Sequence, residues 1–96
     1  MLLRDLENLP GYELVSKGVD DLTRGVSSRE ALLVSIAASR LRENGIPVPR
    51  SVPSEAELQL YRLLRSERPQ DAYSFYNSLL RRLISFEKAL ERLNHQ

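Results

Sequence analysis

The 96-residue sequence has no cysteine, no tryptophan and a single histidine. The absence of cysteine excludes disulfide bonds, thiolate metal sites, iron–sulfur clusters and a cysteine nucleophile. The one histidine, His95, is the penultimate residue, so a histidine-based catalytic triad or a pair of histidine metal ligands within one chain is not expected. The four glycines stand singly and form no phosphate-binding loop. We therefore predict a protein that is not an enzyme and that uses no cofactor and no metal.

The sequence also lacks an excess of charge and a long apolar segment. Fourteen lysines and arginines oppose thirteen acidic residues, so the net charge of +1 attracts neither nucleic acid nor an anionic membrane. The longest uninterrupted apolar run, residues 31–34, is far shorter than the roughly 20 residues that a membrane span needs. Acidic residues interrupt the N-terminal segment, where a signal peptide has an apolar core. We expect a cytoplasmic protein with no membrane partner.

What the sequence does contain is helical periodicity. Apolar residues recur at intervals of three and four, and no stretch alternates at period two. This pattern predicts an all-α fold, a small helical bundle of about five helices, built as two helical hairpins joined by a proline-rich strap over residues 46–53. The whole chain, residues 1–96, is expected to form a single helical domain. The predicted helices cover residues 2–8, 10–24, 28–43, 54–66 and 70–93.

Several short signals mark where these helices begin and end. The segments Ser27–Glu30 and Ser54–Glu57 match the capping box that opens a helix. Gly25 and the pair at residues 44–45 predict left-handed stops. Gly18 lies inside a predicted helix, where glycine costs about 1 kcal/mol relative to alanine. We predict that Gly18 packs closely against another backbone, and we regard the approach of a ligand as the weaker explanation.

The acidic residues of the second predicted helix are the candidates for a catalytic carboxylate. They alternate with basic residues at (i, i+4) spacing, which is typical of a solvated helix surface. We therefore predict a solvent-exposed, salt-bridged face that carries Glu13, Lys17, Asp20, Asp21 and Arg24.

The last predicted helix carries an apolar seam at alternating spacings of four and three. Its length of about 36 Å exceeds the diameter of about 32 Å expected for a compact chain of this size. Small domains also bury a limited share of their surface and gain stability from a partner. We therefore predict a non-enzymatic protein–protein interaction module that forms a homodimer, or pairs with another helical protein, through Tyr76, Leu79, Leu83, Phe86 and Leu90. Such a seam is equally typical of the core of one chain.

A nucleic-acid-binding regulator is the alternative hypothesis. The chain has twelve arginines and two lysines, and arginine suits phosphate. Aromatic residues at 73, 75 and 76 lie near these arginines in sequence, as in surfaces that stack on single strands. The proposed contacts would be Arg62, Arg65, Arg68, Arg81 and Arg82. Interspersed acidic residues argue against this hypothesis. An enzyme whose site crosses an oligomer interface is the third and least favoured possibility.

Overall fold

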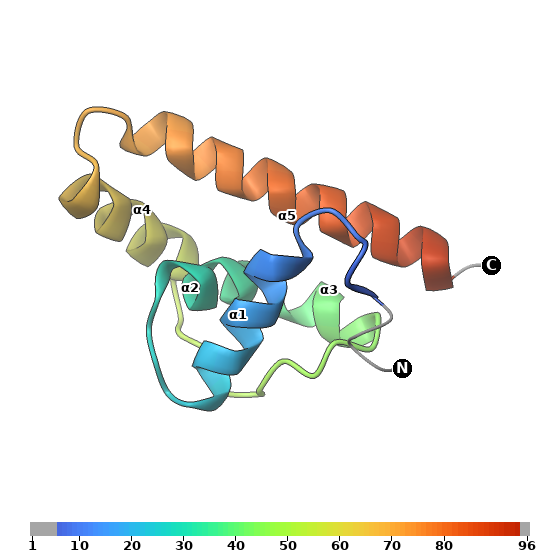
Figure 1. The fold of residues 1–96 in the computed structure, drawn as a ribbon. Coiled ribbons are helices and arrows are strands. Elements are labelled where there is room, and N and C mark those ends of the chain that lie inside the picture. Colours follow the sequence, from blue (N-terminus) through green and yellow to red (C-terminus); the bar gives the residue numbers. More distant parts are fainter. Residues whose placement is uncertain (1–5, 95–96) are drawn as a thin grey trace.

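A computed structural model describes residues 6–94, and this part of the chain forms five α-helices and no strand (Figure 1). The all-α class predicted from the sequence is therefore confirmed. The molecule measures 42 × 25 × 19 Å along its principal axes. The last helix, about 35 Å long, runs along one side of it in Figure 1. The helices are α1 (Tyr12–Thr23), α2 (Arg29–Ile36), α3 (Ala38–Glu43), α4 (Ala56–Glu67) and α5 (Ala72–Asn94).

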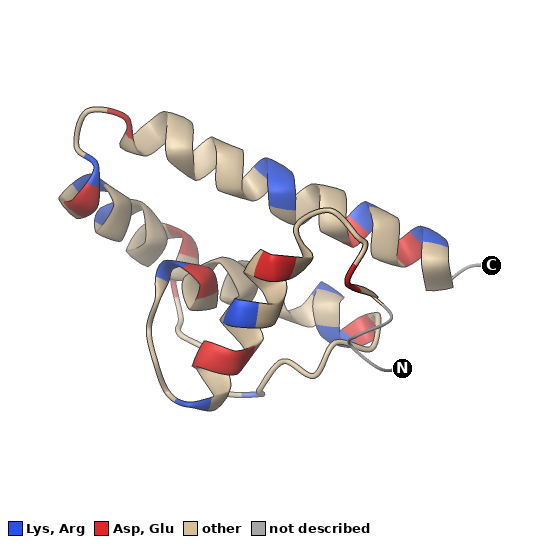
Figure 2. Ribbon diagram, in the orientation of Figure 1, with Lys and Arg blue, Asp and Glu red and all other residues tan. Residues whose placement is uncertain are grey.

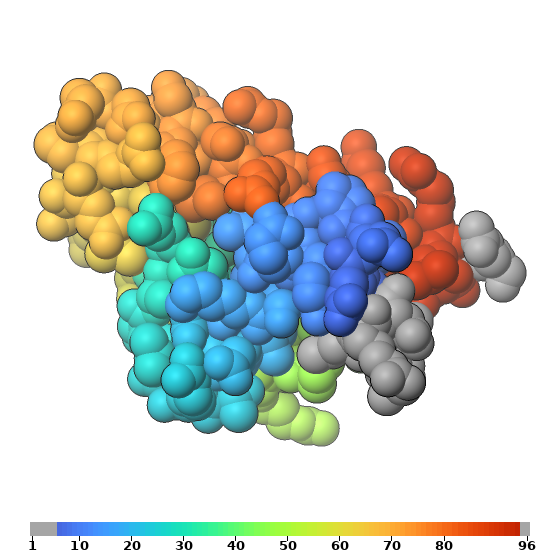
Figure 3. All heavy atoms as spheres, in the orientation of Figure 1, coloured from blue at the N-terminus to red at the C-terminus, as the bar shows by residue number. Residues whose placement is uncertain are grey.

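The helices pack as two pairs that share one core. α1 packs on α2, α4 packs on α5, and α2 also contacts α4, so that α2 links the pairs. The proline-rich strap connects α3 to α4 and buries Ile46 and Val48. Arg42 holds the strap in place, because its guanidinium donates hydrogen bonds to the carbonyl oxygens of Val48, at 3.1 Å, and of Pro49. The space-filling view shows the segment that leads into α1, with the start of this helix, lying over the middle of α5 (Figure 3).

The predicted helix stops are confirmed. Gly25 follows α1 with a φ of 75°, in the left-handed region that favours glycine. Its N–H donates to the carbonyl of Leu22 at 3.1 Å, and the N–H of Val26 donates to that of Asp21 at 2.8 Å. This is the Schellman pattern, in which a left-handed residue satisfies the last carbonyls of a helix. Gly45 ends α3 in the same way, with a φ of 91°.

The predicted capping box at Ser27 is wrong by one residue. The N-cap of α2 is Ser28, whose Oγ accepts a hydrogen bond from the N–H of Ala31 at 3.0 Å. The same hydroxyl donates to the buried carboxylate of Asp21, at 2.6 Å, across the turn from α1. Because only Ser28 makes both bonds, a tertiary contact selects it over its neighbour.

The second predicted capping box is also absent. The N-cap of α4 is Glu55, which has a left-handed φ of 54°, and its side chain makes no capping bond. The helix begins at Ala56, too late for Ser54 to cap it. The backbone carbonyl of Ser54 instead accepts a hydrogen bond from the side-chain amide of Gln59 at 2.7 Å.

The single helix predicted over residues 28–43 is wrong, because the chain breaks at Ala37. This residue has φ −108° and ψ 20°, outside helical values, and it separates α2 from α3. The buried hydroxyl of Ser35 donates to the carbonyl of Ala31 at 2.7 Å, a bond that bends helices. The N–H of Ala37 then bonds to Val34 at 3.1 Å, in the tighter 3₁₀ spacing.

The N-terminal segment differs from its prediction where it is described. Of the helix expected over residues 2–8, residues 2–5 lie outside the described part of the chain. Leu6 to Leu9 form a turn closed by a 2.9 Å hydrogen bond, and the Leu6 side chain is fully buried. α1 begins only at Tyr12, because Gly11 has a left-handed φ of 80°. Gly11 also lies against α5, where an added Cβ atom would be 2.7 Å from the carbonyl oxygen of Arg82.

The close packing predicted at Gly18 is confirmed. α1 crosses α2 at this residue. A Cβ atom added there would lie 2.4 Å from the carbonyl oxygen of Glu30 and 2.4 Å from Cγ2 of Val34. Both distances are well below any tolerated contact, so the glycine allows the two helix backbones to approach.

Candidate functional site

The seam on α5 lies in the core of the chain. Leu79, Leu83, Phe86 and Leu90 are buried against the other helices, and Tyr76 lies at the edge of this core. Leu93, which continues the seam by its spacing, is 38% exposed. Of the two interpretations left open by the sequence, the structure of one chain places four of the five predicted interaction residues in the intramolecular core.

An apolar surface remains beside this seam. Tyr73, Tyr76, Leu80 and Ile84 follow one another at spacings of three and four along α5, so they share one side of the helix. We call these four residues the α5 flank. Tyr73 is 67% exposed and Ile84 is 44% exposed. Leu58 on the neighbouring α4 is also exposed. Four of the five exposed large apolar side chains among residues 6–94 therefore belong to the α4–α5 pair.

A groove runs between the α5 flank and the break in the helix at Ala37. The groove is lined by Leu80 and Ile84 of α5, by the segment 35–39 and by Val52 of the strap. At the rim, Nε of Arg40 donates to the nearly buried carboxylate of Glu87 at 3.0 Å. We call this hollow the break groove, since it is lined by the residues at which α2 gives way to α3.

A second hollow is lined by residues of both α4 and α5. It is lined by Glu57, Leu58, Tyr61, Tyr73 and Tyr76, and we call it the tyrosine pocket. The rings of Tyr61 and Tyr76 meet edge to face, with centroids 5.7 Å apart and planes at 84°. Burial, with a smaller contribution from the negative charge of Glu57, raises the pKa of the Tyr76 hydroxyl. This cluster of tyrosines was not predicted from the sequence.

The acidic face predicted on α1 needs one correction, because Asp21 is buried. Its side chain is 1% exposed, whereas Asp20 is 66% exposed. Its two carboxylate oxygens accept hydrogen bonds from Nζ of Lys17 at 2.6 Å, Oγ of Ser28 at 2.6 Å and Nη2 of Arg24 at 2.9 Å. These donors lower the pKa of Asp21 to about 2, from an ordinary value of 3.8. Asp21 therefore links α1 to the N-cap of α2, and its carboxylate does not belong to the solvated surface of the helix.

This contact predicts acid-dependent stability. Because the pKa of Asp21 is lower in the folded chain than in the unfolded chain, its ionised form stabilises the fold above about pH 4. That stabilisation is lost as the pH falls from about 4 towards 2. We expect Asp21→Asn to lower the midpoint of urea unfolding at pH 7 and to flatten the decline of the midpoint below pH 4. Asp20→Asn, at an exposed neighbour, should leave the curve close to wild type. If the urea midpoints of wild type and Asp21→Asn fall in parallel as the pH is lowered, Asp21 is not the group that causes the loss of stability.

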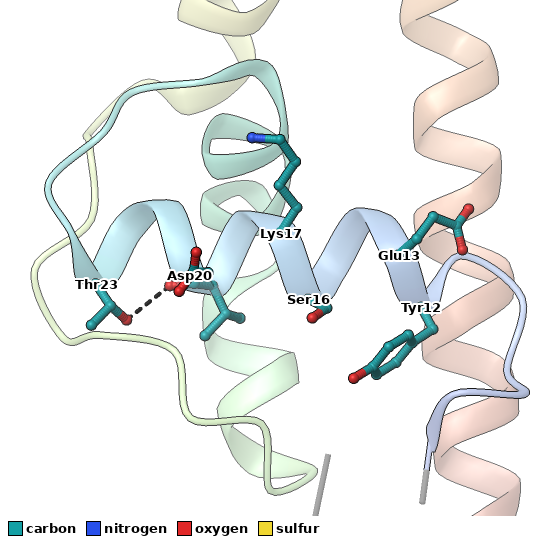
Figure 4. A pocket seen from close by; sticks show the side chains of 7 residues that line it. Tyr12, Glu13, Ser16, Lys17, Asp20 and Thr23 are labelled. Carbon is teal, nitrogen blue, oxygen red and sulfur yellow. Dashed lines mark hydrogen bonds between the residues drawn. The ribbon is translucent and has the colours of Figure 1, made fainter. Parts of the chain in front are cut away.

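A further hollow follows the outer surface of α1. Its lining comes from this helix alone, and Figure 4 shows the side chains leaving the helix in different directions. The dashed line in that view marks the hydrogen bond from Oγ1 of Thr23 to the carbonyl of Val19, at 2.8 Å. Since the lining belongs to one helix and its side chains diverge, these residues do not enclose a ligand. They are Tyr12, Glu13, Ser16, Lys17, Val19, Asp20 and Thr23.

The arginines of the nucleic-acid hypothesis lie in different settings. Arg68 donates two hydrogen bonds to Asp71, at 3.0 and 2.8 Å, and its guanidinium lies 4.1 Å from the centroid of the Phe75 ring. Arg82 pairs with Glu13 of α1. The other three arginines, Arg62, Arg65 and Arg81, are exposed. Acidic and basic segments alternate along α1 and the C-terminal half of α5 (Figure 2), and nucleic-acid binding stays a prediction.

Neither a metal site nor a membrane-spanning helix is found in the described part of the chain. Residues 6–94 bring no three histidine, aspartate or glutamate side chains together as a metal site would require. No helix among them is both long and apolar enough to cross a bilayer. Comparisons with protein-family models, with curated proteins and with solved structures find no match for this chain.

Proposed function

We propose that this protein is a non-enzymatic helical interaction module that forms a homodimer through α5. The observation that carries the proposal is the α5 flank, an apolar side of the longest helix that no other described element covers fully. The residues that make the contact are those of the flank, Tyr73, Tyr76, Leu80 and Ile84, and not the four seam residues that the core uses.

A second copy of the chain suits this surface for two reasons. An exposed apolar strip on a small domain is stabilised when it is removed from water, and a 96-residue chain has little core of its own. A stripe along one helix also matches itself when two copies are related by a two-fold axis, since each α5 then offers the other the same residues in reverse order. The break groove beside Leu80 and Ile84 provides a recess for side chains from the partner.

The decisive experiment is the mass in solution of matched variants over a hundredfold range of concentration. We expect wild type to reach about twice 11.0 kDa as concentration rises. Ile84→Asp places a charge on the flank and should give a mass of 11.0 kDa throughout, with unchanged helicity by circular dichroism. The matched control is Ser85→Asp, which adds the same charge at the next residue, exposed on the other side of α5. A monomeric wild type, or a dimer that tolerates Ile84→Asp, would refute the proposal.

A further inference from the structure

The lining of the tyrosine pocket has an unusual chemistry for a surface hollow. Three of its five residues are tyrosines, one is a leucine and one is the carboxylate of Glu57. None of the five is basic. The edge-to-face arrangement of Tyr61 and Tyr76 presents the two rings at nearly a right angle, so that they form a corner and not a flat wall. Tyr73, 67% exposed, is the most exposed large apolar side chain among residues 6–94.

This combination favours a cation with an apolar surface. The face of an aromatic ring is electron-rich, and it attracts a cation within roughly 6 Å of the ring centre. Rings set at an angle attract such a group from two sides. A carboxylate at the same site adds a full negative charge. The raised pKa of Tyr76, caused in part by Glu57, is consistent with the carboxylate lying close to the rings.

We propose that the tyrosine pocket, lined by Glu57, Tyr61, Tyr73 and Tyr76, binds an alkylammonium group, specifically the methylated lysine side chain of a protein partner. Methyl groups on the ammonium spread the positive charge and weaken hydration, so that the group leaves water readily for aromatic faces. A phosphocholine headgroup carries the same trimethylammonium ion, but its phosphate would be repelled by Glu57. The carboxylate therefore favours the lysine-derived ligand over the lipid headgroup.

This inference goes beyond the proposed homodimer and does not depend on it. Because Tyr73 and Tyr76 also belong to the α5 flank, the proposed dimer would compete with a ligand for them, so binding is measured on wild type and on Ile84→Asp. Ile84 is absent from the pocket lining, so the substituted chain keeps the site whether or not wild type dimerises. If Ile84→Asp binds the probes and wild type keeps the mass of a monomer at every concentration, the pocket is upheld and only the dimer is refuted.

The test is a titration of the tyrosine ring signals by NMR with small probes at constant ionic strength. Trimethyllysine and choline should shift the rings of the pocket saturably. The matched neutral probe is 3,3-dimethyl-1-butanol, which has the shape of choline without its charge, and it should bind roughly tenfold more weakly. Phosphocholine should also bind more weakly than trimethyllysine. Equal binding of choline and the neutral probe would overturn the cation site, and equal binding of phosphocholine would overturn the choice of lysine.

Variants separate the aromatic contribution from the carboxylate. Tyr73→Phe keeps a ring face and should retain most of the affinity, whereas Tyr73→Leu should lose it by roughly fivefold or more. Glu57→Gln should weaken trimethyllysine several-fold and leave the neutral probe unaffected. Both positions are exposed, so neither change disturbs the core. No saturable shift with any cation, or identical affinities for Tyr73→Phe and Tyr73→Leu, would refute the proposal.

Discussion

Replacing Phe86 with alanine is expected to cause a large loss of the free energy of unfolding. Phe86 is fully buried and is the largest side chain in the core. Truncating a buried phenylalanine costs about 3 to 5 kcal/mol, since apolar contact is lost and a cavity is left. A domain of this length has a total stability of about 5 to 14 kcal/mol. The variant should therefore lose at least about a fifth of the free energy of unfolding, measured by urea denaturation.

The matched control lies on the same seam. Leu93 continues the spacing of Phe86 and Leu90, but its side chain is 38% exposed near the end of α5. Leu93→Ala should cost less than about 1 kcal/mol. A pattern-based interpretation assigns the two residues the same role, whereas the structure separates them. Similar losses for both variants would show that the C-terminal turn of α5 is packed more tightly than described.

Features that follow from the apolar spacing or from the position of a glycine could be predicted from the sequence. The helix stops at Gly25 and Gly45 were correct because a left-handed glycine ends a helix through backbone bonds within six residues. The all-α class followed from the apolar period alone. The role of Gly18 was inferred correctly, since a glycine in an otherwise strong helix implies a close neighbour.

Features that depend on a particular side-chain hydrogen bond could not. Ser28 and not Ser27 caps α2 because Asp21, seven residues earlier, accepts its hydroxyl hydrogen bond. Asp21 itself was taken as solvated, since (i, i+4) pairing with a basic residue does not reveal that another helix covers the carboxylate. The break at Ala37 depends on a back-bonded hydroxyl at Ser35 that the apolar pattern conceals.

The candidate site was the least predictable part. An apolar seam of period 3.5 indicates that one side of α5 is buried. It does not show whether the same chain or a partner covers that side. The tyrosine pocket arises from the pairing of α4 with α5, which brings Tyr61 to Tyr76 across the turn at residues 68–71. Folding the sequence into a hairpin about Pro69 would have placed these two rings near each other. That signal existed in the sequence, but the choice of register required the structure.

Replacing Gly18 with alanine is expected to destabilise the protein, against the direction of helix propensity. In an open helix the change would stabilise by about 1 kcal/mol. Here the new Cβ atom would lie 2.4 Å from the carbonyl oxygen of Glu30, and a backbone atom cannot move aside unless α2 shifts as a whole. Overpacking of this kind costs about 1 to 3 kcal/mol. After the gain in helix propensity is subtracted, we expect a net loss of up to about 2 kcal/mol, measured as a fall in melting temperature of up to roughly 10 °C.

A double-mutant cycle with Val34 tests the cause. Val34 Cγ2 is the second atom that the new methyl group meets, also at 2.4 Å, so Val34→Ala removes one of the two clashes. Val34→Ala alone should be destabilising, because the side chain is fully buried. The double variant should lose less free energy of unfolding than the sum of the two single variants, because the smaller side chain at position 34 makes room for the new methyl group. The clash with Glu30 remains, so the rescue should be partial. A rise in melting temperature for Gly18→Ala would mean that α1 and α2 lie further apart than the structure places them.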